Sequence, residues 1–529
     1  MLFTSYSFML FVVIVFAVYY LLPAKWQWLV LLLSSYVFYF FAGKTFLIYI
    51  LVTTVSTYLA AIKIEEKRNS FDDYFELHKK ELDKEGKKAL KEKNKKKLFH
   101  ILLACLVLNI GILAVVKYTN FVISNINAVI DLTGGKTISF VDFVLPMGIS
   151  FYTFQSVAYL LDVYHGKYEA QKHLGKFALF VAFFPQLVQG PISRYNDLSP
   201  SLFKEHSFDR KAISFGLERI LWGYFKKMVI ADRILVAVKV LIEDTATYDG
   251  AFVFVGMMFY ALELYADFTG GIDITIGVAE IFGVKVAENF QRPFFSKNIK
   301  EYWKRWHISM GSWFTDYIFY PVSVSKPFRK LNKFARAHMG ERVGKRLPVY
   351  LSSFVVWLLT GIWHGASWNF IAWGLGNYVV IMISEELEPL YDRFHSRFKV
   401  EGKTYWKVVQ IIRTVLIMSC LRMFDCYRDV PLTFKMFGTM FTSFNISELT
   451  LEAFLGLGLG AADYIILICG VLILTCVSLV QRDRSVRENV FELPFYLRMI
   501  IWWGLFIIVI LFGAYSIGYN ESQFIYNQF

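Results

Sequence analysis

This sequence of 529 residues contains only five cysteines, which lie apart on mostly apolar segments: Cys105, Cys420, Cys426, Cys469 and Cys476. Their spacing matches neither a zinc site nor a disulfide framework, so we expect small buried hydrophobic residues. A serine nucleophile elbow, a glycine-rich phosphate loop and an EF-hand pattern are also missing. The chemistry of those motifs is therefore not expected here.

Charge is also scarce, at 19% of residues, whereas 56% are hydrophobic and the mean hydropathy is +0.45. A soluble domain cannot bury that much apolar surface. Apolar segments of about 20 residues recur, the length of a membrane-spanning helix. We predict an all-α polytopic membrane protein, one embedded domain over 1–529, with about 11–13 spanning or re-entrant helices. The expected helices are 6–22, 26–42, 46–62, 98–118, 140–164, 174–190, 213–241, 251–268, 349–383, 406–421, 464–480 and 497–519.

The net charge is +13, and the longest lysine-rich run lies in a loop at 63–97, which has 13 Lys and Arg residues against nine Asp and Glu residues. Basic loops stay in the cytoplasm, so this insertion is predicted to be cytoplasmic and the chain's start to lie outside. The run could bind nucleic acid or anionic lipid. Acidic residues interrupt it at helical spacing, which favours a solvated helical hairpin and no nucleic-acid partner.

A second polar segment, 285–347, is predicted to be cytoplasmic and interfacial. Residues 302–316 have a helical pattern with Trp303 and Trp306 on one face, typical of a helix lying at the membrane surface. A cytoplasmic location is enough to explain the basic residues of this segment. They would also suit an anionic donor such as a nucleotide-bearing thioester. Asn289, Arg292 and Asp267 either cap helices or line a cavity.

Two histidines beside tryptophans are the candidate catalytic residues. His364 follows an apolar run, where an ionisable group is costly unless protein surrounds it. His307 precedes it in the polar segment. One imidazole could be the general base and the other could position a thioester or stabilise an oxyanion. One alternative is that each ring only forms a hydrogen bond to a backbone carbonyl between packed helices. Another is that the two histidines bind a metal ion, although further metal ligands are not evident.

The ordered blocks Glu288-Asn289-Phe290-Gln291-Arg292-Pro293, Trp303-Lys304-Arg305-Trp306-His307 and Trp363-His364-Gly365, with 265–283, 185–192 and 223–232, resemble the membrane-bound O-acyltransferase (MBOAT) family. The resemblance is closest to its bacterial branch of alginate and peptidoglycan O-acetylation proteins, related to the teichoic-acid D-alanyl transferase. It implies a helical bundle with a central funnel or tunnel, His364 as catalytic residue inside it, and His307 as a second functional position near the cytoplasm.

The resemblance also implies the substrates, partners and place of the protein. The donor is an acyl-CoA, acetyl-CoA by preference, with no bound cofactor or metal, and the site lies in a bacterial cytoplasmic membrane surrounded by lipid. The acyl group would pass to a secreted or membrane-tethered SGNH-type partner and then to a polysaccharide. The candidate substrate-binding residues are Asn289, Arg292, Asp267, Gln189, Trp303 and Trp368.

The aromatic tail 520–529 is similar to the tails of alginate-type members. The hypothesis is that Tyr526 enters the tunnel, is deprotonated by His364 and carries the acyl group. The alternative is an interfacial anchor. The block 423–426 departs from the family pattern because it lacks an arginine.

Three functions compete at this point: O-acetylation of an envelope polysaccharide, D-alanyl transfer to teichoic acid, and proton-coupled transport or lipid flipping by intramembrane histidines. The paired repeats that are common in transporters are not seen. A structural scaffold would not need His364.

Overall fold

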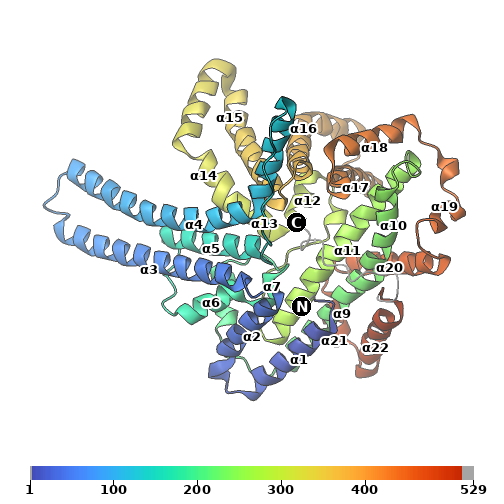
Figure 1. The fold of residues 1–529 in the computed structure, drawn as a ribbon, viewed down its shortest axis with the longest axis horizontal. Helices are drawn as coiled ribbons and strands as arrows, with labels where there is room; N and C mark the ends of the chain where they lie inside the picture. The colour runs from blue at the N-terminus through green and yellow to red at the C-terminus, as the bar shows by residue number, and fades with distance from the viewer. Residues whose placement is uncertain (1–2, 515–529) are drawn as a thin grey trace. The chain divides into compact units, whose positions relative to one another are not determined.

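The computed structural model describes residues 3–514, which form two compact units of helices. Among the described residues, the first unit comprises 3–213 and Val278–Ala287, and the second comprises Ser214–Gly277 and 288–514. Within the described residues the only β-type pairing is one bridge, between Phe290 and Trp306. The predicted all-α membrane class is confirmed: seven described helices are long and apolar enough to cross a bilayer, and Figure 1 traces the chain through them.

The first unit is built from α1 to α8, with the segment Val278–Ala287 returning to α1. Tyr19 donates its hydroxyl hydrogen bond to the carbonyl of Phe282 over 3.0 Å, and the two rings pack edge to face. Its helices are α1 Tyr6–Leu21, α2 Gln27–Ala42, α3 Phe46–His78, α4 Lys84–Thr133, α5 Ile149–Tyr164, α6 Leu174–Ala182, α7 Phe184–Leu187 and α8 Tyr195–Leu202.

The charged loop at 63–97 is a helical hairpin, as predicted. Helix α3 continues to His78, and α4 begins at Lys84 with Asp83 as its N-cap, whose side chain accepts from the amide of Gly86. Figure 1 shows the two helices running side by side along this extension. Most side chains there are exposed, which fits alternating charges at helical spacing.

The prediction of a single helix at 174–190 was wrong. The chain makes α6, breaks at Phe183 and forms only the short α7 before Val188. Pro185 lacks the backbone N–H that a continuing helix would use, so the helix cannot run through this position unchanged. The break leaves Gln189 in a non-helical, fully buried stretch.

The second unit contains the longer helices that carry the candidate site. They are α9 Arg210–Tyr224 (its first turn still in the first unit), α10 Asp232–Glu243, α11 Ala251–Ile281, α12 Ile299–Arg305, α13 Ile308–Phe314, α14 Tyr320–Ser323, α15 Lys326–His364, α16 Trp368–Phe398, α17 Thr404–Tyr427, α18 Val430–Thr442, α19 Leu451–Leu455, α20 Ala461–Val480, α21 Val486–Glu492 and α22 Phe495–Phe512. A π-helical stretch, Phe225–Ala231, joins α9 to α10.

Glycines bring α9 and α11 into backbone contact. A Cβ at Gly223 would lie 2.6 Å from the carbonyl oxygen of Gly270, and one at Gly277 would lie 2.6 Å from that of Gly216. Only glycine permits such an approach, the usual device of packed membrane helices. The close crossing holds polar side chains of the two helices together.

Two further helix predictions were wrong, and both breaks fall at candidate site residues. The helix expected at 302–316 is interrupted at His307, which adopts the left-handed conformation with φ 49°. The helix expected at 349–383 is two helices, since α15 ends at His364 and α16 begins at Trp368. The periodicity of the apolar residues continues across both breaks, so it could not reveal them.

Candidate active site

Asn289 builds the surroundings of His307. Its side-chain oxygen accepts from both the amide (3.0 Å) and the hydroxyl (2.9 Å) of Ser309, and its backbone oxygen accepts from the amide of Ile308. The residue therefore caps α13 from a distant loop, which explains how the chain can break at His307 without leaving these amides unpaired. Of the two alternatives expected for Asn289, a helix cap or a cavity-lining residue, the structure shows the cap.

The same amide fixes the tautomer of His307. Because the oxygen of Asn289 faces two donors, its nitrogen faces Nδ1 of His307, 3.3 Å away. An amide nitrogen can only donate, so Nδ1 accepts and the proton of the neutral ring sits on Nε2. Burial and the nearby Arg422 guanidinium lower the pKa of His307 to about 3. The ring is therefore neutral at physiological pH, with Nε2–H as its donor.

Aromatic rings enclose His307 on several sides. Phe268 of α11 lies 5.0 Å away between ring centroids and Trp363 of α15 lies 6.1 Å away. Trp306 stacks on Tyr302 at 12° and meets Phe268 at 6.2 Å. His307 is fully buried among these rings, which accounts for the fall in its pKa.

His364 sits at the C-terminal end of α15, where the backbone turns toward α16. Its ring lies 4.6 Å from that of Trp373 and 5.1 Å from that of Trp363, and 9% of the residue is exposed. Close packing of α15 on α16 holds this arrangement, since a Cβ at Gly374 would lie 2.5 Å from the carbonyl oxygen of Trp357. Trp363 contacts both histidines and so brings them into one site.

Arg422 is a charged residue of this site that the sequence reasoning missed. Its guanidinium lies 4.9 Å from the ring centroids of both Trp306 and Trp373, and it pairs with Asp425 at 3.1 Å. A charged pair three residues apart in an otherwise apolar helix was the available signal, since buried charges of this kind are usually functional.

Comparison with known proteins identifies the family of this chain. Residues 171–340 match the model of the membrane-bound O-acyltransferase family. "Probable alginate O-acetylase AlgI" of Azotobacter vinelandii is 30% identical over 446 residues, covering 84% of this chain and 78% of the relative. The chain belongs to the membrane-bound O-acyltransferase family.

Two other relatives have different named activities. The peptidoglycan O-acetyltransferase of Helicobacter pylori is 28% identical over 403 residues, covering 71% of this chain and 67% of the relative. The teichoic acid D-alanyltransferase of Bacillus subtilis is 28% identical over 281 residues, covering 52% and 66%. The protein is thus a multi-pass membrane O-acyltransferase. His307 lies inside the matched segment 171–340, and His364 lies beyond it.

Asp267 lies next to the candidate site, because the following residue, Phe268, contacts His307. It sits in the middle of α11, so the capping alternative is wrong; instead it pairs with Lys227 at 2.5 Å. Lys227 also pairs with Asp232 at 2.8 Å, which balances the buried cation. The next residue, Phe268, packs on His307. Asp267 therefore anchors the helix that presents Phe268.

The other predicted substrate-binding residues lie in different surroundings. Trp303 packs against Trp357 and Trp373 in the aromatic cluster, at 4.8 and 5.8 Å. Trp368, at the start of α16, is 58% exposed. Gln189 belongs to the first unit, where both polar atoms of its side chain are buried without a partner. Tyr526 lies outside the described residues.

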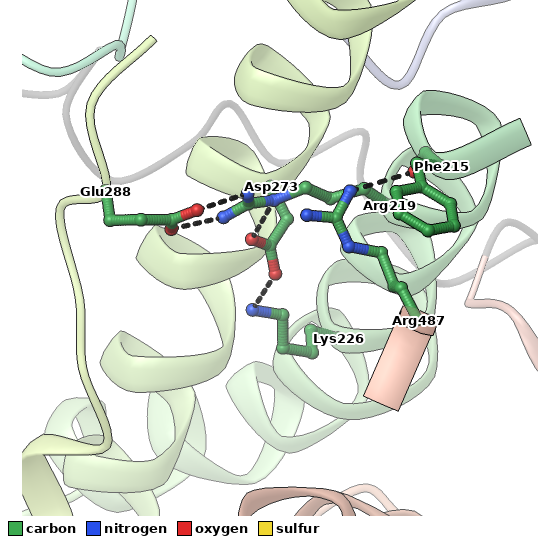
Figure 2. A network of polar contacts seen from close by, with 6 residues as sticks. All are labelled: Phe215, Arg219, Lys226, Asp273, Glu288 and Arg487. Atoms are coloured by element: carbon green, nitrogen blue, oxygen red, sulfur yellow. Dashed lines mark hydrogen bonds and ion pairs between the residues drawn. The ribbon is translucent and has the colours of Figure 1, made fainter. Parts of the chain in front are cut away.

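Arg292 adopts a left-handed backbone (φ 52°) and lines a cavity of about 680 Å³. The polar network on one wall of this cavity is drawn in Figure 2: Arg219 binds both oxygens of Glu288 at 2.5 Å, and Asp273 bridges Arg219 and Lys226. Tyr265 and Phe290, also in the lining, contact Trp306. One layer of rings separates the cavity from the His307 environment. Within residues 3–514, no group of three potential metal ligands is found.

Proposed function

We propose that this enzyme transfers an acetyl group from acetyl-CoA on the cytoplasmic side of a bacterial cytoplasmic membrane for O-acylation of a cell-envelope polysaccharide. Two relatives support this reaction by their names, one an alginate O-acetylase and one a peptidoglycan O-acetyltransferase. The D-alanyl transferase relative aligns over a smaller share of the chain, 52% against 84%. The acceptor would be reached through an SGNH-type partner on the outer side.

In the proposed mechanism, His364 is the general base. An imidazole nitrogen of His364 takes the proton of the attacking hydroxyl while the hydroxyl oxygen bonds to the thioester carbonyl carbon. The C–S bond then breaks, and the sulfur leaves with the proton held by His364 as a free thiol. If Tyr526 is the first acceptor, the same exchange forms a tyrosyl ester, and a second hydroxyl repeats it.

The proposed role of His307 is to donate a hydrogen bond to the developing oxyanion. The observation that carries this assignment is the contact from Asn289 to Nδ1, because it leaves Nε2–H as the donor of a ring that is neutral. A fixed donor in a dry aromatic surrounding stabilises developing charge more strongly than the same donor in water. The shared contact of both histidines with Trp363 supports their action on one acyl group.

The test uses the full chain in nanodiscs, with labelled acetyl-CoA and a soluble polysaccharide together with its SGNH-type partner. We expect label to pass to protein or acceptor in the wild type and to be lost in His364→Ala. An acyl adduct that persists in Tyr526→Phe would contradict the carrier role of Tyr526. Transfer only from a D-alanyl thioester would show that D-alanyl, and not acetyl, is the acyl group transferred. Proton flux without any acyl transfer would support the transporter alternative.

A further inference from the structure

The cavity that is lined by Arg219, Lys226, Asp273 and Glu288 has two chemically different walls. One is apolar and comes from two helices, with Leu474 and Val477 from α20, and Ile501 and Leu505 from α22. These helices are the least enclosed by protein of the candidate spans that line the cavity: 22% of the apolar window of α20 and 6% of that of α22 are buried. This wall therefore continues a surface that faces the hydrocarbon of the membrane.

The other wall carries an excess of positive charge. Seven cationic residues and three carboxylates line the cavity. Two of those carboxylates, Asp273 and Glu288, are already held by Arg219 and Lys226 (Figure 2). Arg292 and the arginines after α20 line the same space, so cationic residues outnumber carboxylates in the lining by four. Burial, followed by repulsion from Arg305 and Arg482, lowers the pKa of Arg292, as expected where cations crowd together.

The arginines after α20 also indicate the depth of the cavity. Arg482, Arg484 and Arg487 lie within seven residues of Val480, at the end of a spanning helix. Basic residues next to a span mark its cytoplasmic end. Arg487 is held in place, because it donates to the carbonyl of Phe215 over 3.1 Å and lies over its ring. A ligand here would meet charge at the interface and apolar surface deeper in the membrane.

We propose that the cavity binds an anionic phospholipid, with its phosphate against Arg484 and Arg487 and an acyl chain along α20 and α22. Guanidinium groups match phosphate oxygens in geometry and charge. The apolar wall distinguishes this ligand from the nucleotide part of an acyl donor, which carries phosphates but no long chain to cover that wall. The bound lipid would fill the space beside Tyr265 and Phe290, one ring layer from the His307 site.

The experiment measures lipid retention by the full chain in nanodiscs of equal phosphatidylglycerol and phosphatidylcholine. After mild extraction, native mass spectrometry counts the lipids that remain bound. We expect the wild type to retain phosphatidylglycerol, and Arg484→Gln combined with Arg487→Gln to weaken retention about 25-fold, since each basic residue near the surface contributes roughly fivefold. The matched control is Arg393→Gln with Arg397→Gln, which removes two exposed arginines of α16 outside the lining and should leave retention unchanged.

A second variant guards against misfolding of the arginine variant. Val477→Trp fills the apolar half without changing charge and should also displace the lipid. Equal retention in the wild type and both cavity variants would overturn the proposal. Displacement of the lipid by micromolar coenzyme A would overturn it too, and assign the cavity to the donor. Lipid retention is independent of acetyl transfer, so failure of one does not imply failure of the other.

Discussion

His307 and His364 lie in one aromatic cluster, but the chain holds the two rings differently. A hydrogen bond from Asn289 fixes the tautomer of His307, and the residue is fully buried at a break between two short helices. His364 ends a long helix and packs between two indoles, with slight exposure. A ring with a fixed proton and a low pKa suits donation, whereas a ring that retains some exposure suits proton exchange with a substrate. This difference is consistent with the proposed roles, His307 as hydrogen-bond donor and His364 as general base.

Glutamine substitutions test this difference most strongly. Glutamine can place an N–H near the position of Nε2 but cannot take up a proton at neutral pH. We expect His364→Gln and His364→Ala to lower kcat by the same factor, about 10² to 10⁴. His307→Ala should cost about 10² to 10³, and His307→Gln should recover at least tenfold of that loss. Steady-state acetyl transfer gives the comparison; a His307→Gln variant as inactive as His307→Ala would contradict the donor role.

Arg422 connects the two regions, because its guanidinium contacts Trp306 next to His307 and Trp373 next to His364. Arg422→Met leaves Asp425 buried without its partner and should lower the free energy of unfolding by about 3–5 kcal/mol. The control is Arg422→Met combined with Asp425→Leu, which removes both charges and should recover most of the stability without restoring activity. Thermal unfolding in detergent measures the first effect and acetyl transfer the second. Equal stability of single and double variants would show that the pair is not coupled.

Asn289→Asp changes the tautomer while keeping the cap. The carboxylate still accepts from Ser309, but it can no longer donate to Nδ1 of His307 and would instead draw a proton there. We expect kcat to fall about 10- to 100-fold, the usual cost of losing a residue that orients a functional imidazole. Ser309→Ala removes only the hydroxyl donor to the same oxygen and should change kcat less than threefold. If the two variants behave alike, Asn289 acts as a cap alone.

The pH dependence of the free energy of unfolding should reveal that the buried ring of His307 stays neutral in the folded protein. The pKa of His307 is about 3 in the folded protein and about 6.5 in an unfolded chain, so below pH 6.5 the unfolded state takes up a proton that the folded state refuses. Stability is then lost as the pH falls from 6.5 toward 3, by about 1.6 kcal/mol between pH 6.5 and 5. The Tm of His307→Gln should fall less over that range than the Tm of the wild type. Parallel Tm curves would contradict a low pKa for His307.

Much of the architecture could be predicted without coordinates, for a physical reason. Hydrocarbon imposes long apolar segments and charge in loops, so the helical class and the hairpin of α3 and α4 could be predicted from composition alone. Breaks inside these segments could not. The left-handed turn at His307 depends on hydrogen bonds to Asn289, which lies 18 residues earlier in the chain.

The chemical types of the candidate residues could likewise be predicted from the sequence, but their roles could not. In the sequence, both histidines, Asn289 and the surrounding tryptophans are recognisable as candidates by their unusual position among apolar residues. Arg422 was missed, because its contacts with indole rings are made by helices that are distant in the chain. Only tertiary structure decided which nitrogen of His307 carries the proton, since a tautomer is set by the partner that the fold brings to the ring.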